Sequence, residues 1–199
     1  MRALYKVQWL MIGVLLVACR SDPVHYHTLT PLLSAAPRNV QPGTELQIER
    51  VTVPPQVDRS QVVLRQGTHE LVILETDWWG ASLADELESA LINQFSATGS
   101  PGSSGNGGNH GNGSKTTLRI DVQRFDLVPG QYALLDVKWR IRSGPTGVKT
   151  GNELTCQNRF QTPAASPAIE GLVMAQQENL RQLASVISGV SRSGARRCP

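Results

Sequence analysis

Two histidines near the start of the chain are the first candidates for chemistry. His25 and His27 are two residues apart, so on a β-strand both imidazoles would point to the same side and could hold a metal ion. The chain has 4 histidines in all, and no third ligand accompanies this pair at a suitable spacing. We therefore interpret both as polar residues of a first strand and expect no metal or cofactor.

Familiar catalytic motifs are missing from the sequence. The chain contains no nucleophile elbow, zinc-protease helix, dinucleotide-binding fingerprint or Cys-x-x-Cys pair. Residues 99–114 are rich in glycine, but Lys115 follows Ser114 without the Gly-Lys-Ser/Thr pattern of a phosphate-binding loop. The absence of these motifs favours a protein that is not an enzyme.

Cys19 carries the clearest chemical signal. Arg2 and Lys6 form a positive start, and an uncharged apolar run over residues 9–18 leads directly to the cysteine. The run is too short to span a bilayer, which needs about 20 apolar residues, but it suits the hydrophobic region of a secretory signal. Leu16-Val17-Ala18-Cys19 resembles a bacterial lipobox, in which small residues precede a cysteine that is acylated and exposed by cleavage.

A lipobox predicts a permanent membrane anchor, because two or more acyl chains hold a protein to a bilayer effectively irreversibly. Residues 1–18 would be removed as a signal peptide, and residues 19–24 would form a tether that starts at acylated Cys19. Arg20, rather than Asp, in the second mature position resembles lipoproteins sorted to the outer membrane. The alternative is an ordinary signal peptide with an unmodified cysteine nearby.

The substitution Cys19→Ala tests the anchor. We expect the wild-type protein to incorporate radioactive palmitate and the variant to carry none, because the thiol is the group that accepts the diacyl modification. Autoradiography of the purified proteins measures the label. A C19A protein that still carried label would contradict the lipobox.

The charge balance argues against nucleic acid as a partner. Removing Arg2 and Lys6 from 19 basic side chains leaves 17 against 16 acidic ones, so the mature surface is close to neutral. Phosphate-backbone binding needs a clear excess of positive charge.

Cys156 and Cys198 are the two cysteines that remain in the mature chain. A compartment outside the cytoplasm permits a disulfide between them, which would contribute on the order of 4 kcal/mol in the chain-entropy model. Cys198 lies one residue from the end in a Gly/Ser/Arg tail, so two unpaired thiols are the alternative. The sequence does not choose between these alternatives.

Alternating apolar residues predict that the first half of the mature chain is rich in strands. Pro54-Pro55 ends one of them, since proline cannot donate to a strand ladder, and a turn containing Gly67 joins two others. The predicted strands cover residues 25–29, 46–53, 61–65 and 70–75.

The spacing of apolar residues then changes to three and four, which predicts a helix over residues 82–95. Ser82 with Asp85 three residues later fits an N-terminal capping box. Residues 99–114 hold seven glycines, four serines and three asparagines, so we expect a flexible insert without chemistry.

The second half is predicted to contain a long hairpin, a further strand and a last helix. Pro129-Gly130 separates strands at residues 117–128 and 132–142, and a third strand covers residues 151–162. Ser166 followed by Pro167 suits the start of a helix whose apolar stripe ends near Gly189, with a loose tail over residues 191–199. The predicted fold is α+β, a mixed, largely antiparallel sheet covered by two helices in one domain, residues 25–190.

Two stretches resemble a known family. Val51-Thr52-Val53-Pro54, then Asp58-Arg59 and Gln61-Val62-Val63-Leu64-Arg65, resemble the signature V-x-V/L-P-x-x-x-D-R-x-Q-I-V-x-R of the PqiC-type ABC-transport auxiliary lipoproteins. Trp79 followed by Leu83 resembles the Trp-x-x-x-Leu of that family at the entry to a helix. The resemblance covers nearly the whole mature chain and implies an α+β domain similar to the amino-terminal domain of TolB.

The resemblance also implies a function. It predicts an outer-membrane lipoprotein, facing the periplasm, that works with an inner-membrane protein carrying MCE (mammalian cell entry) domains to move lipids between the membranes. The alternative is a lipoprotein that binds a small ligand or supports envelope integrity without any conduit. Which lipid moves, in which direction, and whether copies form a homo-oligomer stay open.

The motif supplies the candidate site residues. We expect Trp79 in the core and Trp78 exposed as an interface residue, because neighbours on a strand point to opposite sides. Asp58 and Arg59 either contact the partner or are structural, with Asp58 capping a turn and Arg59 pairing with a carboxylate; we favour the structural role. The family-motif and interface candidates are Pro54, Asp58, Arg59, Gln61, Arg65, Trp78 and Trp79.

Overall fold

The computed structural model describes residues 22–31, 46–98, 102–104, 114–145, 152–194 and 196–199. The predicted signal peptide, Cys19 and residues 105–113 lie outside these ranges. In chain order the elements are β1 (His25–His27), β2 (Leu46–Thr52), β3 (Gln61–Gln66), β4 (Glu70–Trp79), α2 (Leu83–Ala97), β5 (Gly102–Ser104), β6 (Ser114–Val128), β7 (Tyr132–Pro145), β8 (Asn152–Pro163) and α3 (Ile169–Ser193).

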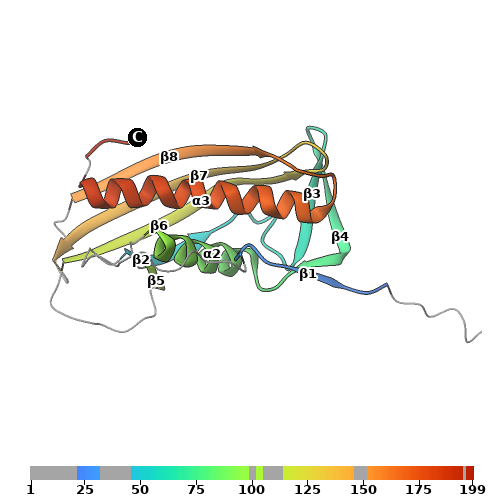
Figure 1. The fold of residues 1–199 in the computed structure, drawn as a ribbon, viewed down its shortest axis with the longest axis horizontal. Helices are drawn as coiled ribbons and strands as arrows, with labels where there is room; N and C mark the ends of the chain where they lie inside the picture. Colours follow the sequence, from blue (N-terminus) through green and yellow to red (C-terminus); the bar gives the residue numbers. More distant parts are fainter. Residues whose placement is uncertain (1–21, 32–45, 99–101, 105–113, 146–151, 195) are drawn as a thin grey trace, which may run out of the picture.

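A mixed five-stranded sheet in the order β5-β2-β6-β7-β8 forms the body of the molecule (Figure 1). Its centre is the predicted hairpin of β6 and β7, which pair antiparallel from Val128 opposite Tyr132 to Ser114 opposite Pro145. Gly130 has a φ of 68°, which suits the Pro-Gly turn at the end of this hairpin. Strand β8 continues the antiparallel pairing, whereas β2 runs parallel to β6 and β5.

Both helices cover one face of this sheet (Figure 1). Helix α2 packs on β2 and β5, and α3 packs on β7 and β8 and against α2. The predicted alternation is confirmed, because one side of each central strand is buried beneath the helices. These buried strand residues include Leu118, Ile120, Val122, Leu135, Val137, Trp139 and Ile141.

A smaller sheet in the order β1-β4-β3 lies at one end of the body. Gly67, with a φ of 63°, makes the predicted turn between β3 and β4, and β1 runs parallel to β4. The α+β class predicted from the sequence is confirmed, and the strands divide between two sheets.

Buried polar side chains fix the register of α3 on the sheet. The amide nitrogens of Gln176 and Asn179 donate to the backbone oxygens of Leu134 and Ala133, at 3.2 and 3.1 Å, and Thr162 donates to Asn179 at 2.7 Å. A buried amide without such partners would destabilise the core, so sliding the helix along the sheet is costly. The apolar stripe seen in the sequence gave no sign of these contacts.

The capping box that begins α2 is confirmed. The backbone nitrogen of Asp85 donates to the Ser82 hydroxyl oxygen at 3.3 Å, and that hydroxyl donates to the Asp85 carboxylate at 2.6 Å. The first of these bonds satisfies one of the free amide groups at the start of the helix, and the second orients the Ser82 hydroxyl.

Helix α3 differs from the prediction at both ends. It begins after Ala168, because Ser166 packs against the first turn instead of capping it: a Cβ on Gly171 would lie 2.6 Å from the Ser166 hydroxyl oxygen. The helix passes through Gly189, since Val190 continues the buried stripe, and ends at Gly194 in the left-handed conformation. The tail expected from residue 191 is therefore helical as far as Ser193.

The insert also contains one ordered element that the sequence did not predict. Residues 102–104 form β5 on the edge of β2. A Cβ on Gly102 would lie 3.3 Å from Ile92 and Phe95, so the missing side chain lets this strand approach α2.

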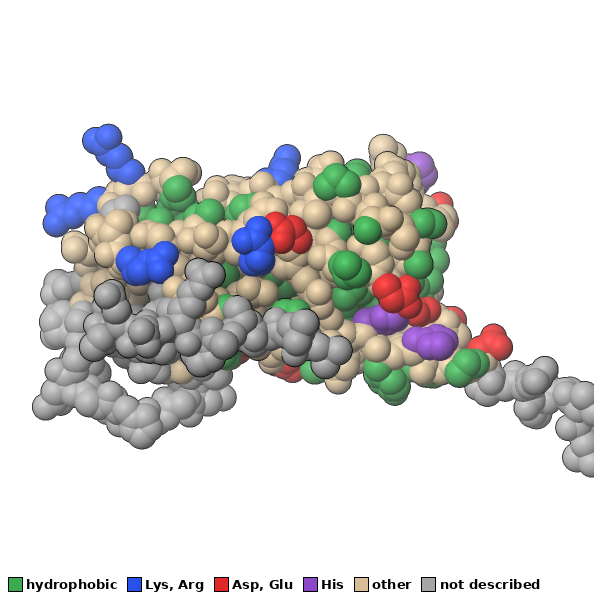
Figure 2. Space-filling view, viewed as in Figure 1, with side chains coloured by type: hydrophobic (Ala, Val, Ile, Leu, Met, Phe, Trp, Pro, Cys, Tyr) green, Lys and Arg blue, Asp and Glu red, His purple; other side chains and the backbone are tan. Residues whose placement is uncertain are grey.

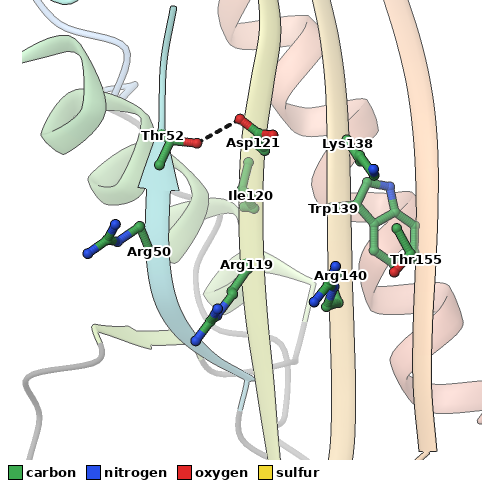
Figure 3. Close-up of a pocket in the computed structure, with 9 residues that line it drawn as sticks. All are labelled: Arg50, Thr52, Arg119, Ile120, Asp121, Lys138, Trp139, Arg140 and Thr155. Carbon is green, nitrogen blue, oxygen red and sulfur yellow. Dashed lines mark hydrogen bonds between the residues drawn. The ribbon is translucent and has the colours of Figure 1, made fainter.

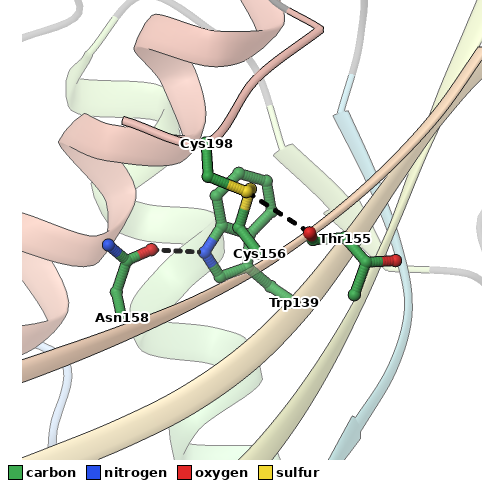
Figure 4. Close-up of a disulfide and its surroundings, with 5 residues drawn as sticks. All are labelled: Trp139, Thr155, Cys156, Asn158 and Cys198. Carbon is green, nitrogen blue, oxygen red and sulfur yellow. Dashed lines mark hydrogen bonds between the residues drawn. A yellow bond between two sulfur atoms is a disulfide. The ribbon is translucent and has the colours of Figure 1, made fainter.

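A disulfide joins Cys156 of β8 to Cys198 near the C-terminus, with an S–S distance of 2.04 Å (Figure 4). Cys156 lies opposite Trp139 in the strand ladder, and the Trp139 ring nitrogen donates to Asn158 at 2.8 Å. The Cys198 sulfur lies 3.3 Å from the Thr155 carbonyl oxygen and, being bonded, has no hydrogen to donate. The bridge ties the segment after α3 back to the sheet.

Reducing the disulfide should lower the free energy of unfolding by about 4 kcal/mol, because the 42-residue separation gives the reduced unfolded chain more freedom. Urea denaturation with and without reductant measures the change. The variant carrying both Cys156→Ala and Cys198→Ala is the control and should not respond to reductant. Equal stability of the oxidised and reduced wild-type protein would contradict this expectation.

Candidate functional site

Most of the family-motif residues gather where the connection between β2 and β3 meets the end of β4, whereas Arg65 lies at the other end of β3, opposite Leu71. Within this connection the amides of Val57 and Asp58 donate to the Pro54 carbonyl at 3.0 and 3.1 Å. The Trp79 amide then donates to the Ser60 carbonyl at 2.6 Å. This last bond joins the two parts of the motif, which are separated in the sequence by β3 and most of β4.

The two tryptophans divide between core and surface. Trp79 is buried, as predicted, and meets Phe125 of β6 edge to face with 6.1 Å between ring centroids. Trp78 is partly exposed, and its ring nitrogen donates to the Glu75 carbonyl at 3.0 Å. Trp79 thereby connects the small sheet to the body, while Trp78 remains accessible.

Trp78 is the middle residue of a row across the small sheet. Tyr26 of β1 lies opposite it on one side and Gln61 of β3 on the other. The Tyr26 side chain is 69% exposed. We call Tyr26, Trp78 and Gln61 the aromatic row.

The predicted pairing of Arg59 with a carboxylate is wrong. Its Nε atom is buried and has no hydrogen-bond partner among the described residues. The Asp58 side chain is exposed, so only its backbone amide belongs to the turn. A buried guanidinium donor without a partner is costly, which makes Arg59 the motif residue least explained by the fold.

Arg65 has a structural role. Its Nε donates to the buried carboxylate of Asp126 at 2.7 Å, and Arg124 contacts the other oxygen of the same carboxylate. The pair links β3 to β6. Loss of Arg65 would leave a buried charge with less compensation.

Glu86 holds the strand at which the predicted tether enters the domain. Its carboxylate accepts from the Thr28 hydroxyl and from the Leu29 amide, both at 2.8 Å. Glu86 is buried although it is not one of the apolar residues whose spacing predicts the helix, and its position in the first turn of α2 is the one signal in the sequence. A Cβ on Gly80 would lie 3.0 Å from its carboxylate oxygen, so a glycine suits that position.

His27 takes part in the same attachment. The His27 ring lies 2.9 Å from the Asp77 carboxylate, and the His27 carbonyl accepts from the Gly80 amide at 2.9 Å. His25 is exposed. No group of three or more potential metal ligands occurs in the described ranges.

Ion pairs mark the face of the large sheet that the helices leave open. Burial opposes ionisation of Asp136, but hydrogen bonds from Gln157 and Arg159 outweigh it and hold its pKa below the ordinary value. The hydrogen bond from Arg142 likewise lowers the pKa of Glu153. Both carboxylates are therefore charged at neutral pH and already hydrogen-bonded to arginines of the same face.

Residues 27–188 match the family described as the ABC-type transport auxiliary lipoprotein component. The chain belongs to this family. The match runs from β1 into α3 and includes all the motif residues, which confirms the resemblance drawn from the motif. The family is one of transport components and not a known family of enzymes.

Solved structures share the fold. A crystal structure of an uncharacterized protein is 16% identical, with a TM-score of 0.66, and covers 87% of this chain and 100% of its own. A protein from Xanthomonas campestris is 14% identical, with a TM-score of 0.59 and the same coverage. At such identities the likeness shows the fold alone. No curated protein sequence matches the chain.

None of the helices in the described ranges is long and apolar enough to cross a bilayer. The likeness to the amino-terminal domain of TolB stays a prediction.

Substitution Glu86→Ala should loosen β1. We expect the free energy of unfolding to fall by about 2 kcal/mol, because two hydrogen bonds to a charged group are lost and the Leu29 amide stays buried. Hydrogen exchange at Leu29 should accelerate. Glu88→Ala, on the same helix and partly exposed, is the control. Unchanged exchange at Leu29 would show that other contacts hold the strand.

Proposed function

We propose that this lipoprotein is anchored in the outer membrane through acylated Cys19 and docks an MCE-domain protein of the inner membrane. It would serve there as a non-catalytic component of an intermembrane lipid transport system, with its folded domain in the periplasm. The family assignment supports a role in ABC-type transport. The outer membrane, the MCE partner and the lipid cargo are the proposed refinements.

The aromatic row is the observation that carries the docking proposal. Tyr26 and Trp78 are neighbours on adjacent strands, and both keep ring surface in contact with solvent. Tryptophan and tyrosine supply much of the binding energy at protein interfaces. The row therefore offers a partner a rigid aromatic surface on strands that Trp79 and Arg65 fix to the body.

The position of the row also fits a tethered protein. Tyr26 belongs to β1, the first element after the predicted tether of residues 19–24. Anchoring raises the effective concentration of one partner at the membrane, so modest contacts suffice for stable docking. Glu86 and the His27–Asp77 contact would transmit any load on the tether into α2 and β4.

Trp78→Ala tests the docking surface. We expect recovery of the MCE-domain protein, co-purified in mild detergent, to fall about tenfold or more, because the variant removes a central aromatic contact. Ile73→Ala is the matched control, since it removes another exposed apolar side chain from β4. Quantitative immunoblotting of the co-purified partner measures recovery.

Two outcomes would count against the proposal. If wild-type protein recovers no MCE-domain protein and purifies with a bound small molecule, the ligand-binding alternative replaces it. If Trp78→Ala and Ile73→Ala recover the partner equally well, docking uses a different surface.

A further inference from the structure

Three arginines lie side by side on the open face of the large sheet. Arg50 of β2 is directly opposite Arg119 of β6, which is directly opposite Arg140 of β7. Figure 3 shows them in a row across the three strands, with the helices behind the sheet. Like charges in directly opposed positions of a sheet repel one another, so the fold alone gives no reason for this row.

The carboxylates of this face neutralise only part of the positive charge. Glu49 pairs with Arg119 at 2.5 Å, and Glu153 lies 2.7 Å from Arg142 but 3.5 Å from Arg140. Among the described residues, Arg50 and Lys138 have no ion-pair partner. Asp121, although opposite Lys138 in the ladder, accepts from the Thr52 hydroxyl at 2.7 Å.

A cleft of about 260 Å³ lies among these side chains (Figure 3). Four of its lining residues are basic, one is acidic, and Thr52 and Thr155 contribute hydroxyl groups; the basic ones are Arg50, Arg119, Lys138 and Arg140. Pockets for drug-sized ligands begin at roughly 300 Å³, so this one suits a headgroup and not a whole diacyl lipid. On the helix-bearing face in Figure 2, by contrast, the visible basic side chains are dispersed.

The chemistry of the lining selects a phosphate ester. Guanidinium groups bind phosphate oxygens through paired, charge-assisted hydrogen bonds, and lysine adds a compact positive charge. Asp121 is the acidic residue of the lining and would accept a hydrogen bond from a hydroxyl or ammonium group on the same ligand. Such a ligand would relieve the repulsion within the arginine row.

We propose that this cleft binds the phosphodiester headgroup of a phospholipid, with the acyl chains left outside. The choice of a lipid over free phosphate rests on the proposed role in lipid transport. The cleft would contact the cargo or the adjoining leaflet at the headgroup alone. The site is separate from the aromatic row, which lies on the small sheet.

Isothermal titration of the full acylated protein in uncharged detergent tests the site. The probes are glycerophosphoglycerol, glycerophosphoethanolamine and inorganic phosphate, at about 0.15 M salt to screen non-specific attraction. The variant with both Arg50→Gln and Lys138→Gln removes the two unpaired cations. The control with both Arg181→Gln and Arg192→Gln makes the same change in net charge on exposed positions of α3.

We expect the wild type and the α3 control to bind a glycerophosphodiester equally, and the Arg50/Lys138 variant to bind it about tenfold more weakly or not at all. Its melting temperature should not fall, because both side chains are exposed and repulsion in the row decreases. Equal weakening in both double variants, or no binding by the wild type, would overturn the site.

Inorganic phosphate that binds as tightly as the diesters would overturn the assignment to lipid. The titration uses the protein without any partner. A negative titration therefore contradicts the headgroup site alone, whereas a negative co-purification contradicts the docking proposal. If the protein binds the headgroup probes but does not recover the MCE-domain protein, the proposed headgroup site is supported and the proposed docking role is contradicted.

Discussion

One-sided burial of the central hairpin is the constraint on which the rest of the structure depends. Strands β6 and β7 place Leu118, Val137 and similar residues on one side, and α2 and α3 must cover that side to remove it from water. Gln176 and Asn179 then give α3 a single register by bonding to carbonyl groups of β7. Because both helices pack on this face, the other face of the sheet stays open to solvent and ligands except near the β6–β7 turn, where Asp126 is buried against Arg65 of β3.

The end of the same hairpin supports the surface that we assign to docking. The Trp79 ring packs against Phe125, and Arg65 forms an ion pair with Asp126. An apolar and an ionic contact together hold the small sheet against β6. The motif residues therefore divide by role. Trp79 and Arg65 build the attachment, whereas Trp78 lies on the exposed side of the strands they secure. Arg59 fits neither group, because its Nε is buried and has no hydrogen-bond partner among the described residues. The contacts within the fold therefore do not explain this residue.

The two proposed surfaces fit a single arrangement at a membrane. The aromatic row includes β1, at which the predicted tether enters, and offers apolar contact to a protein. The arginine row lies on the strands of the body and offers charge to a headgroup. Because one surface is aromatic and the other cationic, substitutions in each should affect different ligands.

The sequence by itself determined the local elements and the family, because those depend on patterns of neighbouring residues. Alternation placed β6 and β7, the Ser82 cap began α2, and the motif around Asp58 and Arg59 identified the relatives. Tertiary structure alone decided which distant groups meet. Glu86 is buried because Thr28 and Leu29 fold back onto it, Cys198 reaches Cys156, and three arginines from three strands become neighbours only when the strands take their register. Local pattern carries no information about such long-range pairing, since register and helix placement are set by packing of the whole core.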